Sequence, residues 1–271
     1  MPVVSDSTAA FVKEYCYKEL EIYNSVDKIV CLSDSMRKVL IQIYKIPKHK
    51  IVKIENGFTR QQATSRYVTK NRARAILGIP KLAKVIIYVG RPVRSKGFDA
   101  LLIAVSKLRR KFPELRCVIA GDVNKVVSRW SLCRSCAANI ILTGFLTPSE
   151  LRKWYAAADI GVITSYSEQC SFAALEMMDA GLPIVSSNGM GLRDMFIDGI
   201  NAFVVQIGNV VKVKRYAKRI TDAVQTAFNT STSLQKLFIQ YNHRLLSTKY
   251  SSVEMANKYM KVFRNLEPMK N

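Results

Sequence analysis

The chain has 271 residues, of which 49% are hydrophobic, and its 42 Lys and Arg against 20 Asp and Glu give a formal net charge of +22. This apolar fraction excludes a disordered or collagen-like chain, and the length allows one large domain or two small ones. No apolar run reaches the roughly 20 residues that span a bilayer, and residues 1–15 lack the pattern of a secretory signal, so we expect a cytoplasmic protein.

The first predicted elements lie before residue 60. Residues 27–32 form an apolar run typical of a short buried strand, and the helix that follows, to about residue 44, begins at Ser33 and Asp34. Residues 51–54 predict a second strand, which ends at the turn signal Asn56-Gly57. Residues 58–80 are polar and basic with few apolar anchors, so we expect a linker over 61–82 that joins a first part, 1–60, to the next domain.

Six apolar runs then alternate with stretches of helical periodicity. The runs are residues 85–90, 117–121, 139–143, 159–163, 183–186 and 202–205. The helical stretches are residues 98–112, a segment that opens at 147–150, residues 172–180, and three more near 210–228, 231–246 and 251–266. Unbroken apolar strands separated by helices predict an α/β fold, a Rossmann-like doubly wound parallel sheet covered on both faces. This domain is expected over 83–248, followed by a C-terminal helix over 249–271.

The loop after the first of these strands has the composition of an anion site. In such sheets, ligands bind beyond the carboxyl ends of the strands. Gly90 allows close approach of the backbone, Arg91 offers a planar fork to phosphate oxygens, and Lys96 adds a compact positive charge. Gly97 stands where a helix begins, and helix N-termini favour anions. The alternative is that both basic residues belong only to the surface of a basic protein.

Two carboxylates follow the fourth strand with seven residues between them. Glu168 lies in the loop and Glu176 in the helix, in an apolar setting where a carboxylate needs a partner such as a ribose diol. Backbone N–H groups at 170–172 are expected to be free at the helix start and to suit a diphosphate. The alternative is an acid near a helix N-terminus and a salt-bridged surface glutamate.

Two other motifs do not support a site of their own. Cys133 and Cys136 form a single CxxC, and His49 and His243 lie far away in sequence, so we expect no metal and no cofactor. The segment 189–194 follows a strand but lacks the third glycine of a dinucleotide-binding fingerprint, which makes a dehydrogenase a weaker alternative.

The charge excess favours anionic partners. The densest basic stretch, residues 212–219, is interpreted first as the solvated face of a helix. Peripheral attachment to an anionic inner membrane face is the alternative, because each nearby basic residue adds roughly 1 kcal/mol. No aromatic–basic pattern or recognition-helix motif accompanies the charge, so a basic nucleic-acid-binding protein is the less favoured interpretation.

Taken in order, Gly90-Arg91, Lys96-Gly97, Glu168-x7-Glu176 and the run 181–185 resemble the nucleotide-sugar-binding half of retaining glycosyltransferases with the GT-B fold. The resemblance is to the group 1, glycogen-synthase-like family, and residues 165–171 with 176–178 are most similar to a bacterial branch seen in Bacteroides-type organisms. Residues 26–57 resemble the end of that family's N-terminal acceptor domain. The resemblance covers about residues 20–265 and implies that most of the N-terminal domain is not in this sequence.

The resemblance implies a hexosyltransferase-type enzyme that uses a nucleotide-diphosphate sugar. The acceptor would be a sugar or lipid-linked hydroxyl in polysaccharide, glycolipid or glycopeptide biosynthesis, and configuration would be retained. Arg91, Lys96 and Glu168 would be catalytic, with the two cations binding the diphosphate in place of a metal and Glu168 touching the transferred sugar. Glu176 would bind the ribose. The other donor-binding positions would be Gly90, Cys170, Ser171 and Phe172.

The sequence departs from the family pattern in two places. Gln169 stands where the family commonly has glycine, and the turn at 121–124 lacks a second glycine. Together with the missing acceptor domain, these departures leave open a catalytically inactive nucleotide-sugar-binding module. A chain that works with a separately encoded N-terminal domain is a further possibility.

Overall fold

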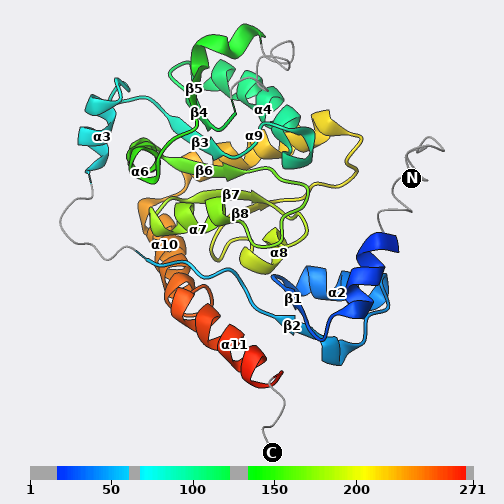
Figure 1. Ribbon diagram of the computed structural model, residues 1–271. Coiled ribbons are helices and arrows are strands. Elements are labelled where there is room, and N and C mark those ends of the chain that lie inside the picture. The colour runs from blue at the N-terminus through cyan, green and yellow to red at the C-terminus, as the bar shows by residue number, and fades with distance from the viewer. Residues whose placement is uncertain (1–16, 61–67, 123–133, 267–271) are drawn as a thin grey trace, which may run out of the picture.

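The computed structural model describes residues 17–60, 68–122 and 134–266, and its centre is a six-stranded parallel sheet (Figure 1). The strand order is β5-β4-β3-β6-β7-β8. The strands are β3 (Val85–Val89), β4 (Arg116–Ala120), β5 (Ile140–Gly144), β6 (Ile160–Ile163), β7 (Ile184–Ser187) and β8 (Phe203–Val205). Every predicted strand of this domain is present within a residue or two, because each is a largely apolar run, and the central strands β3 and β6 are buried on both faces. The α/β prediction is confirmed.

Helices cover both faces of the sheet and create two hydrophobic clusters. On one face α4 (Phe98–Lys111) packs against α9 (Val213–Asn229), around buried residues that include Leu101 and Ile220. On the other face α6 (Pro148–Ala157), α7 (Phe172–Asp179) and α10 (Thr232–Ser247) build a second cluster. The chain also has α8 (Leu192–Met195), α11 (Ser252–Arg264), and the short 3-10 helices η1 (Lys48–Lys50), η2 (Arg94–Lys96) and η4 (Arg134–Asn139).

β3 is the topological switch point of this sheet. It pairs with β4 on one side and with β6 on the other, so the chain winds outward from it in both directions. The helices after β3 and β6 therefore lie on opposite faces, and their first turns diverge. This divergence opens a crevice at the carboxyl ends of β3 and β6, where the sequence places its candidate residues.

The first part of the chain forms a small unit of its own. β1 (Ile29–Cys31) pairs in parallel with β2 (Ile51–Lys53), and a helix over residues 17–25 and α2 (Asp34–Gln42) accompany them around a third hydrophobic cluster. In Figure 1 this unit lies beside α8, and the Asp194 carboxylate of α8 accepts a hydrogen bond from the Ser35 amide at 2.8 Å. We call it the β1–β2 unit.

The predicted linker contains a packed helix that the sequence interpretation did not include. α3 (Lys70–Ile76) packs on α6, and its Arg74 is only 5% exposed. The Arg74 guanidinium donates to the carbonyls of Ala157 at 3.0 Å and Lys81 at 2.6 Å, and to the Asp159 carboxylate at 2.9 Å. This segment is thus anchored by a buried arginine together with a few small or partly buried apolar residues such as Ala73 and Leu77, and the sequence pattern gave no sign of the arginine's contribution.

The basic stretch 212–219 forms the start of α9. Lys214, Arg215, Lys218 and Arg219 are exposed, whereas Tyr216 and Ala217 are buried against the sheet, as the solvated-face interpretation requires. In the described ranges, no helix is both long and apolar enough to cross a membrane.

Candidate functional site

A cavity of about 310 Å³ lies at the carboxyl ends of β3 and β6. Seven of the eight predicted site residues line it, and the sequence separates the first from the last by more than 80 positions. They are Gly90, Arg91, Lys96, Glu168, Cys170, Ser171 and Phe172. The crevice rule for doubly wound sheets therefore placed these residues together correctly.

The loop after β3 is held by contacts that leave its cations facing the cavity. The Tyr88 hydroxyl donates to the Arg91 carbonyl at 2.8 Å, and burial raises the pKa of Tyr88, which keeps the phenol neutral as a donor. Arg91 itself is exposed. Thr164 fixes the other end of the loop, because its hydroxyl donates to the Lys96 carbonyl at 2.8 Å. Arg91 and Lys96 thus lie on one wall with their backbone positions set.

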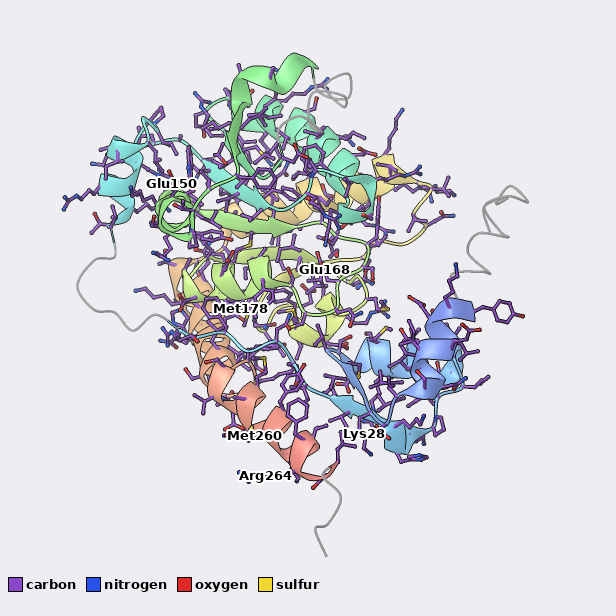
Figure 2. The ribbon with its side chains drawn as sticks, viewed as in Figure 1. Lys28, Glu150, Glu168, Met178, Met260 and Arg264 are labelled. Atoms are coloured by element: carbon purple, nitrogen blue, oxygen red, sulfur yellow. The ribbon has the colours of Figure 1, made fainter. Side chains whose placement is uncertain are left out.

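Lys96 and Glu168 form an ion pair across the cavity. The Lys96 ammonium donates to Glu168 Oε1 at 2.6 Å, and the side chains are 22% and 17% exposed. The Ser165 hydroxyl donates to the same oxygen at 2.8 Å. The Glu168 amide, in the loop that leads into α7 (Figure 2), donates to the Met190 carbonyl at 2.9 Å. Backbone and side chain of Glu168 are therefore both restrained.

The first turn of α7 forms the opposite wall. Ser171 caps this helix by accepting a hydrogen bond from the Ala174 amide at 3.3 Å. The Cys170 carbonyl accepts from the Asn56 side chain at 2.9 Å, and burial raises the pKa of the Cys170 thiol, which disfavours the thiolate. Phe172 is 56% exposed at the rim. The amides of a first helical turn lack helical partners and carry partial positive charge, so this wall suits an anion.

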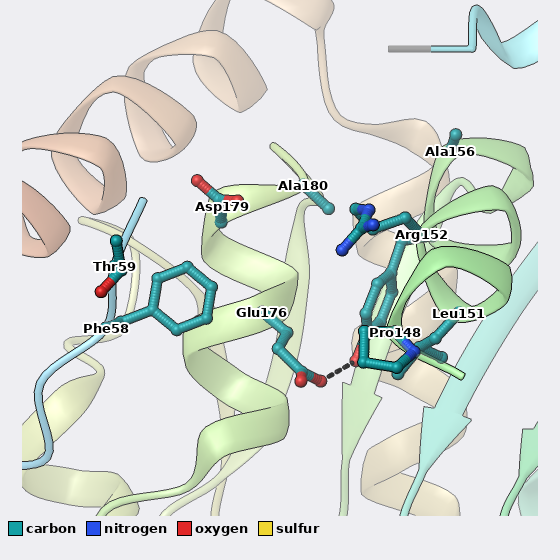
Figure 3. Close-up of a pocket in the computed structure, with 10 residues that line it drawn as sticks. Phe58, Thr59, Pro148, Leu151, Arg152, Ala156, Glu176, Asp179 and Ala180 are labelled. Atoms are coloured by element: carbon teal, nitrogen blue, oxygen red, sulfur yellow. Dashed lines mark hydrogen bonds between the residues drawn. The ribbon is translucent and has the colours of Figure 1, made fainter. Parts of the chain in front are cut away.

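Glu176 borders a second cavity, of about 190 Å³, between α6 and α7 (Figure 3). Its Oε2 accepts a hydrogen bond from the Tyr155 hydroxyl at 2.8 Å. Burial raises the pKa of the Glu176 carboxyl, and the hydrogen bond from Tyr155 opposes that shift. Phe58 and Thr59 of the chain leading from β2 lie across the same cavity. Glu176 thus lies about one helical turn beyond Phe172, beside a different cavity from the one that Lys96 and Glu168 line, and its assignment to a ribose stays a prediction.

The sequence interpretation missed two partners of its own candidates, Ser165 and Tyr155. Ser165 stands in the loop that was singled out, and its spacing of three from Glu168 was the available signal. Tyr155 comes from a different helix, and nothing in the sequence connects it with Glu176.

The glycine-rich segment after β7 has a packing role. Gly191 has φ +79°, and a Cβ there would lie 2.0 Å from the Glu168 carbonyl oxygen. A Cβ on Gly189 would lie 2.6 Å from the Ser165 carbonyl oxygen. The two glycines therefore allow the 188–191 loop to pack against the loop that carries Glu168, which explains them without a dinucleotide.

No three His, Cys, Asp or Glu side chains gather as a metal site in the part of the chain that the structure describes. Cys133 lies outside the described residues, so the single CxxC is not placed. That the reaction needs no metal stays a prediction, resting on Arg91 and Lys96.

Comparison with known proteins identifies the chain's relatives. It is 29% identical over 204 residues to an uncharacterized glycosyltransferase of Methanocaldococcus jannaschii, covering 74% of this chain and 51% of that protein. It is 28% identical over 198 residues to the D-inositol 3-phosphate glycosyltransferase of Thermobispora bispora, covering 69% and 46%. The chain thus spans about half the length of these curated relatives.

The fold is likewise shared with solved glycosyltransferases of the GT-B class. The structure of Anabaena HepE in complex with UDP-glucose aligns with a TM-score of 0.76 at 17% identity, over 93% of this chain and 67% of that one. The family described as Glycosyl transferases group 1 matches residues 69–245, well over half of the chain. The protein therefore belongs to the group 1 glycosyltransferase family.

Proposed function

We propose that this chain binds the donor of a glycosyltransferase that moves a hexosyl group from a nucleotide-diphosphate sugar to an acceptor hydroxyl, with retention of configuration. The observation that carries the proposal is the cavity in which Arg91 and Lys96 face Glu168 and the first turn of α7. Two cations, a helix N-terminus and a carboxylate in one crevice match a diphosphate joined to a sugar.

Arg91 and Lys96 stabilise the negative charge that develops on the diphosphate during the reaction. When the bond between the anomeric carbon and the phosphate oxygen breaks, charge accumulates on the diphosphate, and Arg91 and Lys96 stabilise it without a metal. The acceptor oxygen bonds to the anomeric carbon on the face that the leaving phosphate vacates, and that phosphate takes the hydroxyl proton. Lys96 shares its hydrogen bonds between Glu168 and the phosphate in this state.

Glu168 holds the transferred sugar in this proposal. Its Oε1 already accepts from Lys96 and Ser165, which leaves Oε2 as the oxygen for sugar hydroxyls. Because Ser165 and the Met190 contact restrain this carboxylate, it is preorganised for such hydroxyls. Gly90 and the amides at 170–172 complete the donor-binding wall.

The relatives guide the choice of donor and acceptor. UDP-glucose, which HepE binds, is a first donor to test, and an inositol phosphate, named for the Thermobispora bispora relative, is a first acceptor. A lipid-linked acceptor at the inner membrane face, and an N-terminal domain supplied in trans, belong to the same proposal.

Calorimetric titration tests the donor site. We expect saturable binding of one of UDP, GDP or ADP and of its sugar conjugate, with Lys96→Ala weakening the affinity about 10- to 100-fold because a charge-assisted hydrogen bond is lost. Lys107→Ala, which removes an exposed lysine on α4, is the matched control and should bind like the wild type.

A folded wild-type chain that binds no nucleotide at two salt concentrations would contradict the proposal. Binding without transfer to any acceptor, also with an added N-terminal domain, would support the inactive binding module instead.

A further inference from the structure

We propose that Tyr155 is a positioning residue that makes the site discriminate ribose from deoxyribose, by fixing the orientation of Glu176. The inference rests on the proposed function, in which Glu176 accepts hydrogen bonds from the donor's ribose. Its direct observation is the 2.8 Å hydrogen bond from the Tyr155 hydroxyl to Glu176 Oε2, drawn in Figure 3.

Tyr155 itself is rigidly held. Its side chain is 2% exposed and belongs to the hydrophobic cluster on the face that α6 and α7 cover. α6 begins with a complete capping box, in which Thr147 and Glu150 exchange side-chain and backbone hydrogen bonds. A ring locked in a packed cluster on a capped helix presents its hydroxyl at one place, so the bond determines where the Glu176 carboxylate lies.

The protonation states of the pair fit this role. Burial and the charge of Glu176 raise the pKa of Tyr155 well above its usual value, so the phenol stays a donor. The same bond counters the effect of burial on the Glu176 pKa and so favours the ionised form. An ionised carboxylate is acceptor-only, as a pair of ribose hydroxyls requires.

The two carboxylate oxygens of Glu176 have different partners in this proposal. Oε2 is taken by Tyr155, so Oε1 is the oxygen offered to the ligand. Glu176 is half-buried beside an open cavity, and without Tyr155 its side chain has other rotamers available there. Loss of the Tyr155 hydroxyl should therefore weaken the binding only of ligands whose hydroxyls donate hydrogen bonds to the Glu176 carboxylate.

Titration of wild type and Tyr155→Phe with the nucleoside diphosphate that binds, and with its 2′,3′-dideoxy counterpart, tests this role. We expect the wild type to prefer the ribose form, and Tyr155→Phe to reduce that preference about five- to tenfold while leaving the dideoxy affinity unchanged. Tyr216→Phe is the matched control. It removes an equally buried phenol that donates to the Thr164 carbonyl at 2.8 Å, and it should leave the preference intact.

The outcomes separate the two proposals. If neither diphosphate binds the wild type, the donor-binding function fails and the inference with it. If both bind equally well, Glu176 does not hold the ribose and the inference is overturned. A third outcome is that the wild type discriminates, that Glu176→Ala abolishes this discrimination, and that Tyr155→Phe retains it. In that case Tyr155 has a structural role only, and the inference is wrong while the proposed function stands.

Discussion

At the scale of single residues, Gly97 is where the two loops of the site meet most closely. Its φ is +65°, and a Cβ would lie 1.9 Å from the Thr164 carbonyl oxygen. Lys96 comes directly before this glycine and Ser165 directly after that threonine. The close approach of these backbones therefore brings the loop after β3 and the Glu168 loop together.

Gly97→Ala measures this close approach when it is compared with Gly78→Ala. Gly78 has the same φ, but nothing lies within 4 Å of its Cβ position. Alanine at Gly78 should therefore lower the free energy of unfolding by about 1 kcal/mol, from the left-handed backbone conformation alone. We expect Gly97→Ala to lower the free energy of unfolding by at least about 3 kcal/mol, because the backbone must also move. Urea denaturation of both variants gives the difference. Equal losses would show that the loops can separate without cost.

At the scale of elements, α3 depends on Arg74 for its position. The guanidinium joins α3 to the end of α6 and to Asp159, which also accepts from the Val85 amide at 2.7 Å and pairs with Lys70. One buried cation therefore holds a helix, the start of β3 and the turn before β6 together.

Arg74→Ala should destabilise the protein by about 3–5 kcal/mol, because it leaves the Ala157 and Lys81 carbonyls without this donor and removes one of the partners of Asp159. Arg72→Ala removes an exposed arginine from the same helix and should cost less than about 0.5 kcal/mol. Thermal or chemical unfolding of the two variants makes the comparison. A small loss for Arg74→Ala would mean that α3 packs independently of this network.

At the scale of the whole molecule, the net charge of +22 exceeds what the proposed donor site needs. The described part of α9 presents an exposed basic face in its first two turns. Such a face suits the anionic leaflet of the membrane at which a lipid-linked acceptor would be found.

Reversing three charges tests this surface. Lys214→Glu, Arg215→Glu and Lys218→Glu in one protein should weaken sedimentation with phosphatidylserine vesicles at least about tenfold, since each basic residue near the leaflet contributes about 1 kcal/mol. Binding should also fall with added salt and be absent with phosphatidylcholine.

A charge-matched control reverses three exposed basic residues on α10 and α11, namely Lys236, Arg244 and Lys261. If both triple variants lose the same affinity, net charge and not the α9 surface governs attachment. Tight, salt-sensitive binding of nucleic acid by the wild type would favour the alternative that the charge excess left open.

The sequence predicts what depends on local pattern. Strands such as 85–89 and 160–163 were found because a strand buried on both faces is an uninterrupted apolar run, and the crevice rule then placed Arg91, Lys96 and Glu168 in one cavity. The individual side-chain contacts between distant segments were not predicted. Lys96 and Glu168, assigned to different parts of a ligand, bond to each other across 72 positions. α3 was missed because it is short and largely polar, and the partners of its buried charge, Arg74, lie in other elements.

The attachments of the β1–β2 unit reach the site at two points. Asn56 donates to the Cys170 carbonyl, and Ser35 donates to Asp194 of α8, which follows directly on the 188–191 loop that Glu168 contacts. Turning this unit relative to the sheet strains both attachments. A ligand that stiffens the Glu168 loop should therefore restrict the rotation of the β1–β2 unit relative to the sheet. Because such coupling is reciprocal, a change in the orientation of the unit should in turn change the affinity for that ligand. The orientation of the β1–β2 unit is thus coupled to the proposed donor site, and a spectroscopic distance between α2 and α9 measures that orientation.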